Sequence, residues 1–217
     1  MYYRKRAVLL LCGLVGSVVF AVILVRRNTE AKSRPVSFPY TIDSVLVIEG
    51  LVGYEGAFVE KGNEEVVDVA GAIVTNCSDQ IIQEARIHME CQTGSYEFEV
   101  SYLPPGTSTL ALEVEAKIWT KDLVRSCDVE YAFGLGIPDG LLVQQMEDGV
   151  VALTNTTEYS MNNIRIYHKN WAKEAGMFLG GIAYETYAGD LEPGQFVFLK
   201  PEFYVSGMSQ IIAATKY

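Results

Sequence analysis

The cysteines and histidines are the side chains with the best chemistry for metal binding or nucleophilic catalysis. The chain contains no Cys-x-x-Cys pair, and its histidines and cysteines do not combine into the two spaced ligand pairs of a zinc site, so a zinc site is not predicted. It also lacks the Gly-x-Ser-x-Gly, Ser-x-x-Lys and Cys–His patterns of nucleophilic enzymes. We therefore predict no catalytic residue, no metal and no cofactor.

Cys91 and Cys127 form the candidate disulfide. Cys91 ends one predicted strand and Cys127 begins another, and such strand ends can be neighbours. The bridge would close a loop of roughly 35 residues and contribute about 3–4 kcal/mol if unstrained. Cys77 would then be a buried free thiol or an intermolecular partner. A reduced, buried state of all three thiols is the alternative.

The chain from Thr41 onward consists of short runs with the composition of β-strands. In Ser95–Leu103, apolar or aromatic residues alternate with Glu97, Glu99 and Ser101, which is the period of a half-buried strand. Further runs are separated by Gly and Pro turns, and none has a helical period of ten residues or more. We predict an all-β body with strands at 44–53, 65–76, 82–91, 95–103, 109–119 and 127–133.

An internal repeat organises these runs. Val74-Thr-Asn-Cys-Ser matches Leu153-Thr-Asn-Thr-Thr, an Arg follows each Asn by ten residues, and Leu103-Pro-Pro-Gly matches Leu191-Glu-Pro-Gly. We predict two tandem β-sandwiches that meet near the Gly- and Pro-rich segment 134–140. A single larger sandwich with a chance match is the alternative.

Asn76 and Asn155 occupy equivalent places in this repeat, and both fit the Asn-x-Ser/Thr pattern of glycosylation. An Asn at a strand end can also hydrogen-bond its own backbone and fix the turn. The repetition favours this structural role.

The second copy carries a nine-residue insertion, which the spacing places around Ala172–Gly181. Its apolar residues suggest two alternatives. An exposed segment would be a partner-binding loop, whereas a folded-back segment would cover the open edge of the sandwich. The residues concerned are Trp171, Met177, Phe178 and Leu179.

The repeated strand ending in Val/Leu-x-Asn, followed by Leu-x-Pro-Gly, resembles the FxLYD-type and related Ig-like domains of bacterial envelope proteins. The Phe-x-Leu-Tyr-Asp motif itself is replaced by Ile87-His-Met-Glu-Cys91 and Ile166-Tyr-His-Lys-Asn170. The resemblance implies an extracytoplasmic β-sandwich without catalytic activity, and it transfers no functional residue.

The run from Ala7 to Val25 has no charge and no proline. A helix of this length spans roughly 28 Å, close to the hydrocarbon thickness of a bilayer. Because Arg26 and Arg27 follow the run directly and no Ala-x-Ala site is present, we predict an uncleaved signal anchor. Basic residues flank both ends, so we place the N-terminus in the cytoplasm because the cysteine-containing β-rich body suits an oxidising exterior.

The net charge of −10 is distributed unevenly, with +6 on residues 1–34 and −16 on the remainder. An acidic body argues against nucleic acid as a partner. The predicted organisation is therefore a cytoplasmic tip and transmembrane signal anchor (1–27), a linker (28–43) and two Ig-like β-sandwich domains (44–136 and 137–217).

The predicted partners are the lipid bilayer, through residues 7–25, and an envelope protein. The predicted function is a non-enzymatic, membrane-anchored interaction or assembly protein of a bacterial cell envelope. The alternatives are a carbohydrate- or peptide-binding module that uses Tyr184 and Tyr187, and an accessory subunit of an envelope enzyme.

Overall fold

Strands make up nearly all the regular structure in residues 35–62 and 64–216, the part of the chain that the computed structural model describes. The fold is all-β, as the alternating sequence predicts. A short 3-10 helix, η1 (Val59–Lys61), connects β2 to β3. The strands of the first half are β1 (Tyr40–Ile42), β2 (Leu46–Phe58), β3 (Glu64–Asn76), β4 (Ile81–Cys91), β5 (Ser95–Leu103), β6 (Ser108–Leu112) and β7 (Val124–Gly134).

The second half adds six strands and a second 3-10 helix, η2 (Glu147–Gly149), between β8 and β9. Four of these strands are short, and the hairpin β10–β11 is the longest element in this half. The strands are β8 (Leu141–Gln145), β9 (Val151–Asn155), β10 (Met161–Ala172), β11 (Met177–Leu191), β12 (Phe196–Leu199) and β13 (Ser209–Thr215).

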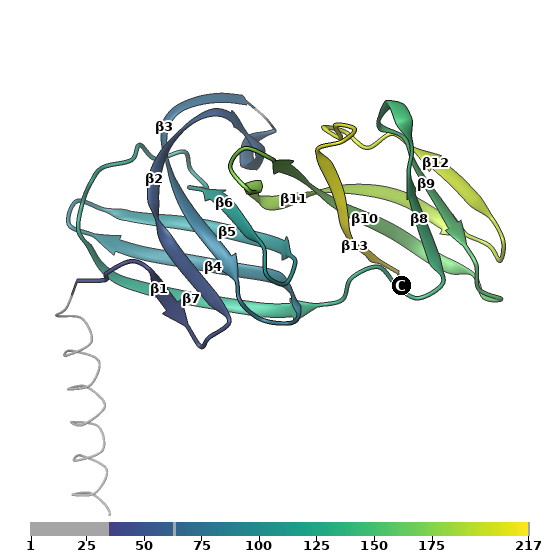
Figure 1. Ribbon diagram of the computed structural model, residues 1–217, viewed down its shortest axis with the longest axis horizontal. Coiled ribbons are helices and arrows are strands. Elements are labelled where there is room, and N and C mark those ends of the chain that lie inside the picture. The colour runs from purple at the N-terminus through teal and green to yellow at the C-terminus, as the bar shows by residue number, and fades with distance from the viewer. Residues whose placement is uncertain (1–34, 63, 217) are drawn as a thin grey trace, which may run out of the picture.

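The same order of strand pairing occurs twice. In residues 46–134, which we call the first repeat, β2, β3 and β6 lie side by side, as do β5, β4 and β7. We call residues 141–215 the second repeat. There β8, β9 and β12 pair in the way that β2, β3 and β6 do, and β11, β10 and β13 pair in the way that β5, β4 and β7 do. The two repeats lie end to end, with the first in blue and teal and the second in green and yellow (Figure 1).

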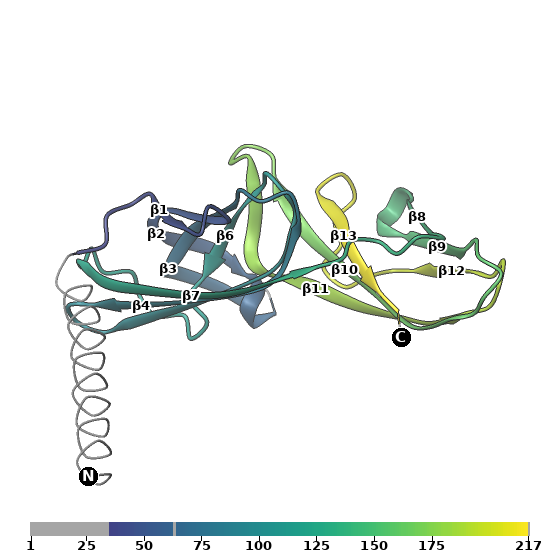
Figure 2. The ribbon, with the colours of Figure 1, turned by 90° about the horizontal axis from the view of Figure 1, so that it is seen from below.

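A parallel contact between β6 and β11 joins the repeats into one continuous sheet. Phe178 and Leu179 of β11 pair with Thr109 and Leu110 of β6. The sheet therefore has seven strands in the order β1-β2-β3-β6-β11-β10-β13, and β11 crosses from one repeat to the other (Figure 2). The predicted boundary near residue 136 lies in the connection between β7 and β8. The seven-stranded sheet nevertheless continues by hydrogen bonds from the first repeat into the second.

Each repeat has an apolar core between two facing layers of strands. In β5, Phe98 and Val100 are buried while Glu97 and Glu99 are exposed, as the alternation predicts. The main core lies between β2, β3 and β6 on one side and β5, β4 and β7 on the other, with Phe178 of the second repeat included. A smaller core fills the second repeat around Leu153.

The predicted strand at Thr109–Trp119 is shorter than its apolar alternation suggests, because β6 ends at Leu112. The next side chain, Glu113, is fully buried and its carboxylate accepts hydrogen bonds from the backbone N–H groups of Glu115 and Lys117, each at 2.9 Å. These bonds hold residues 114–116 out of the ladder. The chain then rejoins β3, where the N–H of Ala70 donates to Lys117 O at 2.9 Å and the N–H of Trp119 donates to Asp68 O at 2.7 Å. The alternation in the sequence does not reveal this interruption beside a buried carboxylate.

The predicted membrane segment, residues 7–25, lies outside the described residues. Among the residues that are described, no helix is long and apolar enough to cross a membrane.

Candidate protein-interaction site

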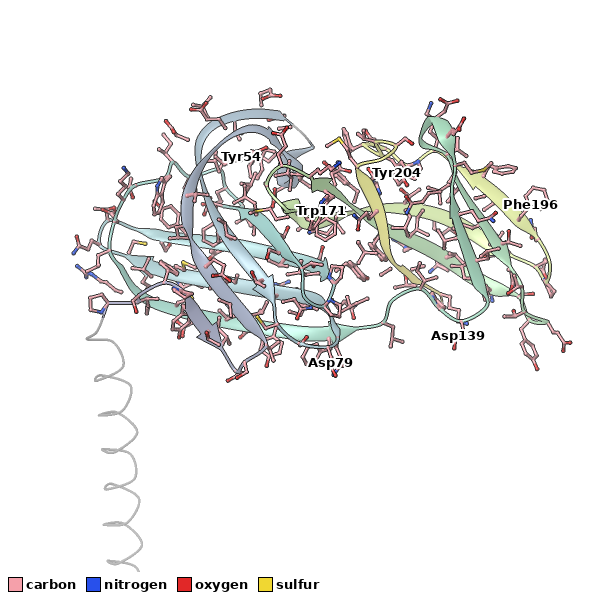
Figure 3. All side chains as sticks on the ribbon, viewed as in Figure 1. Tyr54, Asp79, Asp139, Trp171, Phe196 and Tyr204 are labelled. Atoms are coloured by element: carbon pink, nitrogen blue, oxygen red, sulfur yellow. The ribbon has the colours of Figure 1, made fainter. Side chains whose placement is uncertain are left out.

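The apolar insertion of the second repeat forms part of a hairpin. β10 continues to Ala172 and β11 begins at Met177, so the extra residues lengthen the start of β11. Phe178 is 1% exposed, and its ring contacts that of Trp171 edge-on at 4.9 Å between centroids. Met177 and Leu179 are half-buried against the apolar cluster on β3 and β6. Trp171 lies between the two repeats in Figure 3.

The partner that these four side chains contact in the structure is therefore the first repeat of the same chain. Of the two alternatives that the sequence left open, this geometry corresponds to a segment folded back over a sheet edge. The edge is that of β6, to which Phe178 and Leu179 add as a parallel strand. In this arrangement the segment Trp171–Leu179 is not a freely exposed patch.

Lys169 on β10 anchors the start of β11 from within the second repeat. Its side chain is 1% exposed, and Nζ donates to the carbonyl oxygens of Gly180 (3.0 Å), Ser101 (3.4 Å) and Gly181. The ammonium group has three donors, so these three carbonyls satisfy it. Burial lowers the pKa of Lys169 to about 7, and the nearby carboxylate of Glu60 acts in the opposite direction.

Glu60 anchors the same segment from the first repeat. Its carboxylate accepts hydrogen bonds from the backbone N–H of Gly181 (2.7 Å) and of Leu112 (3.2 Å). Burial raises the pKa of Glu60, and these backbone bonds and the charge of Lys169 lower it. One half-buried acid and one buried base therefore hold the first residues of β11 against both repeats.

Two glycines allow this close approach. Gly180 has φ +80, and a Cβ there would lie 2.5 Å from Val59. A Cβ on Gly181 would collide with the backbone oxygen of Glu99. Thr109 closes the contact by donating to the Gly180 carbonyl at 2.6 Å. Gly181 is required because a side chain there would meet the backbone of Glu99, and Gly180 because its φ is positive and the Val59 side chain fills the space.

Asn76 is fully buried and uses its whole side chain to fix a turn. Nδ2 donates to the carbonyls of Gln80 (2.8 Å) and Leu103 (2.9 Å). Oδ1 accepts from the backbone N–H of Ser78 at 2.9 Å and from its hydroxyl at 2.7 Å.

Asn155 makes the matching set of bonds in the second repeat. Nδ2 donates to Tyr159 O (2.7 Å) and Leu191 O (2.9 Å), and Oδ1 accepts from the N–H and hydroxyl of Thr157. The amide nitrogen that glycosylation would modify is engaged in both repeats. The structural role predicted for these two residues is confirmed.

The predicted disulfide between Cys91 and Cys127 is not formed in the structure, where both are buried free thiols. The strand register accounts for this, because Cys127 lies opposite Met89 while Cys91 lies opposite Val124. The two cysteines are therefore diagonal neighbours on adjacent strands. Burial raises the pKa of both thiols, that of Cys127 to about 12. Cys77, expected to be buried or bridged to another chain, is a free and exposed thiol.

The two histidines point to opposite faces of equivalent strands, as predicted. His88 is partly exposed, with Nδ1 3.4 Å from the carboxylate of Glu97. His168 is fully buried, and its ring packs on Tyr184 (5.0 Å) and Tyr204 (5.2 Å). Burial lowers the pKa of His168 to about 4. Within residues 35–62 and 64–216, no group of three or more His, Cys, Asp or Glu side chains could hold a metal ion.

The tyrosines suggested for ligand binding already have partners in the fold. Tyr184 packs on His168 and, at 5.1 Å, on Phe203. Tyr187 is 58% exposed, but the guanidinium of Arg165 lies over its ring at 5.7 Å. Neither ring is a bare platform of the kind that stacks on a sugar.

The outer face of β5, β4 and β7 is strongly acidic, and we call it the acidic face. Arg86 lies near its centre, 2.8 Å from the carboxylate of Glu84 and 3.8 Å from that of Glu99. A shallow groove of about 240 Å³ runs over Arg86 and His88. The face would attract a cationic surface and repel an anionic one. Its acidic side chains are Glu84, Glu90, Glu97, Glu99, Asp128 and Glu130.

An exposed apolar patch lies on the outer face of the second repeat, and we call it the β12 patch. It consists of Phe196 (61% exposed), Phe198 (58%) and Leu142 (46%). The two phenylalanine rings contact each other at 5.4 Å. Phe196 and Leu142 share this face because both pair with Thr154 of β9.

Sequence reasoning recognised 196–199 as an apolar strand but did not identify its exposed face. The available signal was the repeat itself, which aligns Phe196 with the polar Ser108 of β6.

No protein-family model and no curated protein matches this chain. The function must therefore be inferred from the geometry and the sequence.

Proposed function

We propose that this protein is a membrane-anchored, extracytoplasmic interaction or assembly protein of a cell envelope. It binds its partners through the second repeat and has no enzymatic activity. The observation that supports the proposal is that the β12 patch lies far from the first described residues, which follow the proposed membrane segment. The first described residues, in purple, lie at the end of the first repeat that is remote from the second (Figures 1 and 2). Phe196 lies at the opposite end of the molecule (Figure 3).

The tether to the membrane is proposed from the apolar run Ala7–Val25. Val36 is already docked on the body, since its N–H donates to Val124 O at 2.9 Å. Residues 26–34 can span at most about 32 Å even when fully extended. A body held this close to the bilayer at one end would present its other end to partners.

We further propose that the body consists of two tandem Ig-like β-sandwich domains behind one transmembrane helix. The twofold occurrence of one strand order supports this, as do the matching hydrogen bonds of Asn76 and Asn155. The domains would act as one rod, because Glu60 and Lys169 connect the start of β11 to both repeats. A rigid rod positions a binding surface at a defined distance from its anchor.

Thiol labelling in intact cells tests the proposed location. Cys77 is exposed, Cys91 and Cys127 are buried, and Cys12 lies within the proposed membrane segment. A membrane-impermeant maleimide applied after mild reduction should therefore label Cys77 alone. The Cys77→Ser variant is the control and should remain unlabelled. Labelling of Cys77 only after the cells are permeabilised would contradict an extracytoplasmic body.

Fractionation tests the anchor separately. The full chain should sediment with membranes and resist extraction at high pH, while a chain without residues 1–27 should not. Recovery of the full chain in the soluble fraction would show that residues 7–25 do not anchor it.

A further inference from the structure

The β12 patch lies on a strand with an open edge. β12 is the outermost strand of its sheet, in the order β12-β9-β8, and no strand among residues 35–62 and 64–216 pairs with its other side. An edge strand presents unpaired N–H and C=O groups, which form a template for a further strand. Here the edge also carries two exposed phenylalanines, so an added strand would gain apolar contacts as well as hydrogen bonds.

The first repeat shows what the equivalent edge binds. Phe198 pairs with Ala152 of β9, and Leu110 of β6 pairs with Ile73 in the same register of β3. Phe198 and Leu110 are therefore equivalent positions. Leu110 is 8% exposed, whereas Phe198 is 58% exposed. Leu110 is buried by a cluster with Phe58 and Val69 and by Met177 and Leu179 of β11, which lies beside β6.

The covering element on β6 is the first part of β11, in which Leu179 pairs with Leu110 in parallel. The strand equivalent to β11 in the first repeat is β5, which begins only at Ser95 and lacks this extension. The described chain therefore covers one of its two equivalent edges and leaves the other open.

We propose that the edge of β12 is a docking site for an extended apolar segment of another protein, which adds as a parallel strand and covers Phe198 as Leu179 covers Leu110. Strand addition of this kind takes its affinity from main-chain hydrogen bonds and its specificity from alternate side chains. The inference deepens the proposed function, on which it rests, by naming the class of partner and the surface that binds it.

Two observations favour another protein over a second copy of this chain: the net charge, and the binding of the covering segment within its own chain. Residues 35–217 carry −16, so two copies would repel each other. The patch itself has exposed acidic neighbours, with Glu192 before β12 and Glu147 and Asp148 in the turn between β8 and β9. In each copy, the segment around Phe178 is already paired with β6 of the same chain, so it is not free to pair with β12 of another copy. The segment that docks is therefore apolar at its centre and neutral or basic at its ends.

A peptide with the sequence of the natural covering segment is the probe. Residues 176–183, GMFLGGIA, are synthesised with two lysines at each end and a fluorophore, and binding to the full chain in lipid nanodiscs is followed by anisotropy. We expect saturable binding that Phe198→Lys or Phe196→Lys weakens at least tenfold. Tyr159→Lys, which introduces the same charge at an aromatic residue 78% exposed in a loop, should leave binding unchanged.

A benzophenone amino acid at position 198 should cross-link the peptide, and the same group at position 159 should not. Absence of saturable binding, or equal binding to Phe198→Lys and Tyr159→Lys, would overturn the inference. So would a dimer of the full chain that Phe198→Lys dissociates, because a second copy would then be the occupant. Cytoplasmic labelling of Cys77 would contradict the proposed location without affecting this binding result.

Discussion

Replacing Lys169 by methionine should separate the start of β11 from its anchor. At pH 6, below the pKa of about 7, Lys169 carries an ammonium group whose donors are bonded to the carbonyls of Gly180, Gly181 and Ser101. Methionine has a similar length but cannot donate. The substitution therefore removes the polar contacts while nearly preserving the packed volume.

The expected loss follows from these contacts. A buried carbonyl left without a partner costs about 1–3 kcal/mol, whereas methionine avoids the cost of burying a charge, which lowers the pKa of Lys169. Glu60 would also lose the nearby positive charge that lowers its pKa. We expect Lys169→Met to lower the free energy of unfolding by about 2 kcal/mol in urea titrations of the full chain in detergent. Tryptophan fluorescence reports the transition, because Trp119 and Trp171 both pack against the main core and Trp171 lies between the repeats (Figure 3).

Lys173→Met is the matched control, because Lys173 is exposed in the turn between β10 and β11. It should change the free energy of unfolding by no more than about 0.5 kcal/mol. The double variant with Glu60→Gln should lose less than the sum of the two single variants, with a coupling of about 0.5–3 kcal/mol. A loss below about 1 kcal/mol for Lys169→Met would refute the assignment of Lys169 as the anchor.

Three further predictions concern packing, protonation and thiol access. Phe178→Ala should cost about 3–5 kcal/mol in the same urea titration, since the ring is 1% exposed; a smaller loss than about 1 kcal/mol would contradict its burial. The folded-state pKa of His168 is about 4 against an ordinary 6.5, so the unfolded chain binds a proton in this interval and the folded chain does not. Stability should therefore fall by about 3 kcal/mol as the pH drops from 6.5 to 4, and His168→Met, which introduces the residue of the equivalent position in the first repeat, should lose this part of the slope. Iodoacetamide should modify Cys77 in the native protein but Cys91 and Cys127 only in urea, because burial raises the pKa of both thiols; mass spectrometry of the native sample showing all three modified would contradict the structure.

Several features of the fold were predictable because they depend on short segments. The alternation in Ser95–Leu103 defines its buried and exposed faces within one strand. Asn76 and Asn155 form their turns mainly with residues two to four positions away, so the same short sequence gives the same turn twice. The end of β6 at Leu112 was not predictable, because it depends on the burial of Glu113 by the surrounding layers.

The candidate interaction site was only partly predictable. Sequence reasoning selected Trp171–Leu179 as the apolar segment able to bind a partner, and the structure places it against β6. It passed over Phe196 and Phe198, which the structure leaves exposed. Both segments are apolar runs in strands, and nothing within either run distinguishes the covered one from the open one.

The sequence by itself determined that the body from Thr41 onward is all-β, which residues face inward in strands such as Ser95–Leu103, and that one turn is built twice. Those properties follow from period-two alternation and from side chains that bond their own backbone, and both act over a few residues. Only the tertiary structure decided that Phe178 and Lys169 are buried while Phe198 is exposed. That outcome depends on contacts such as Thr109 with Gly180, which join residues 71 positions apart, and burial is set by such distant pairings.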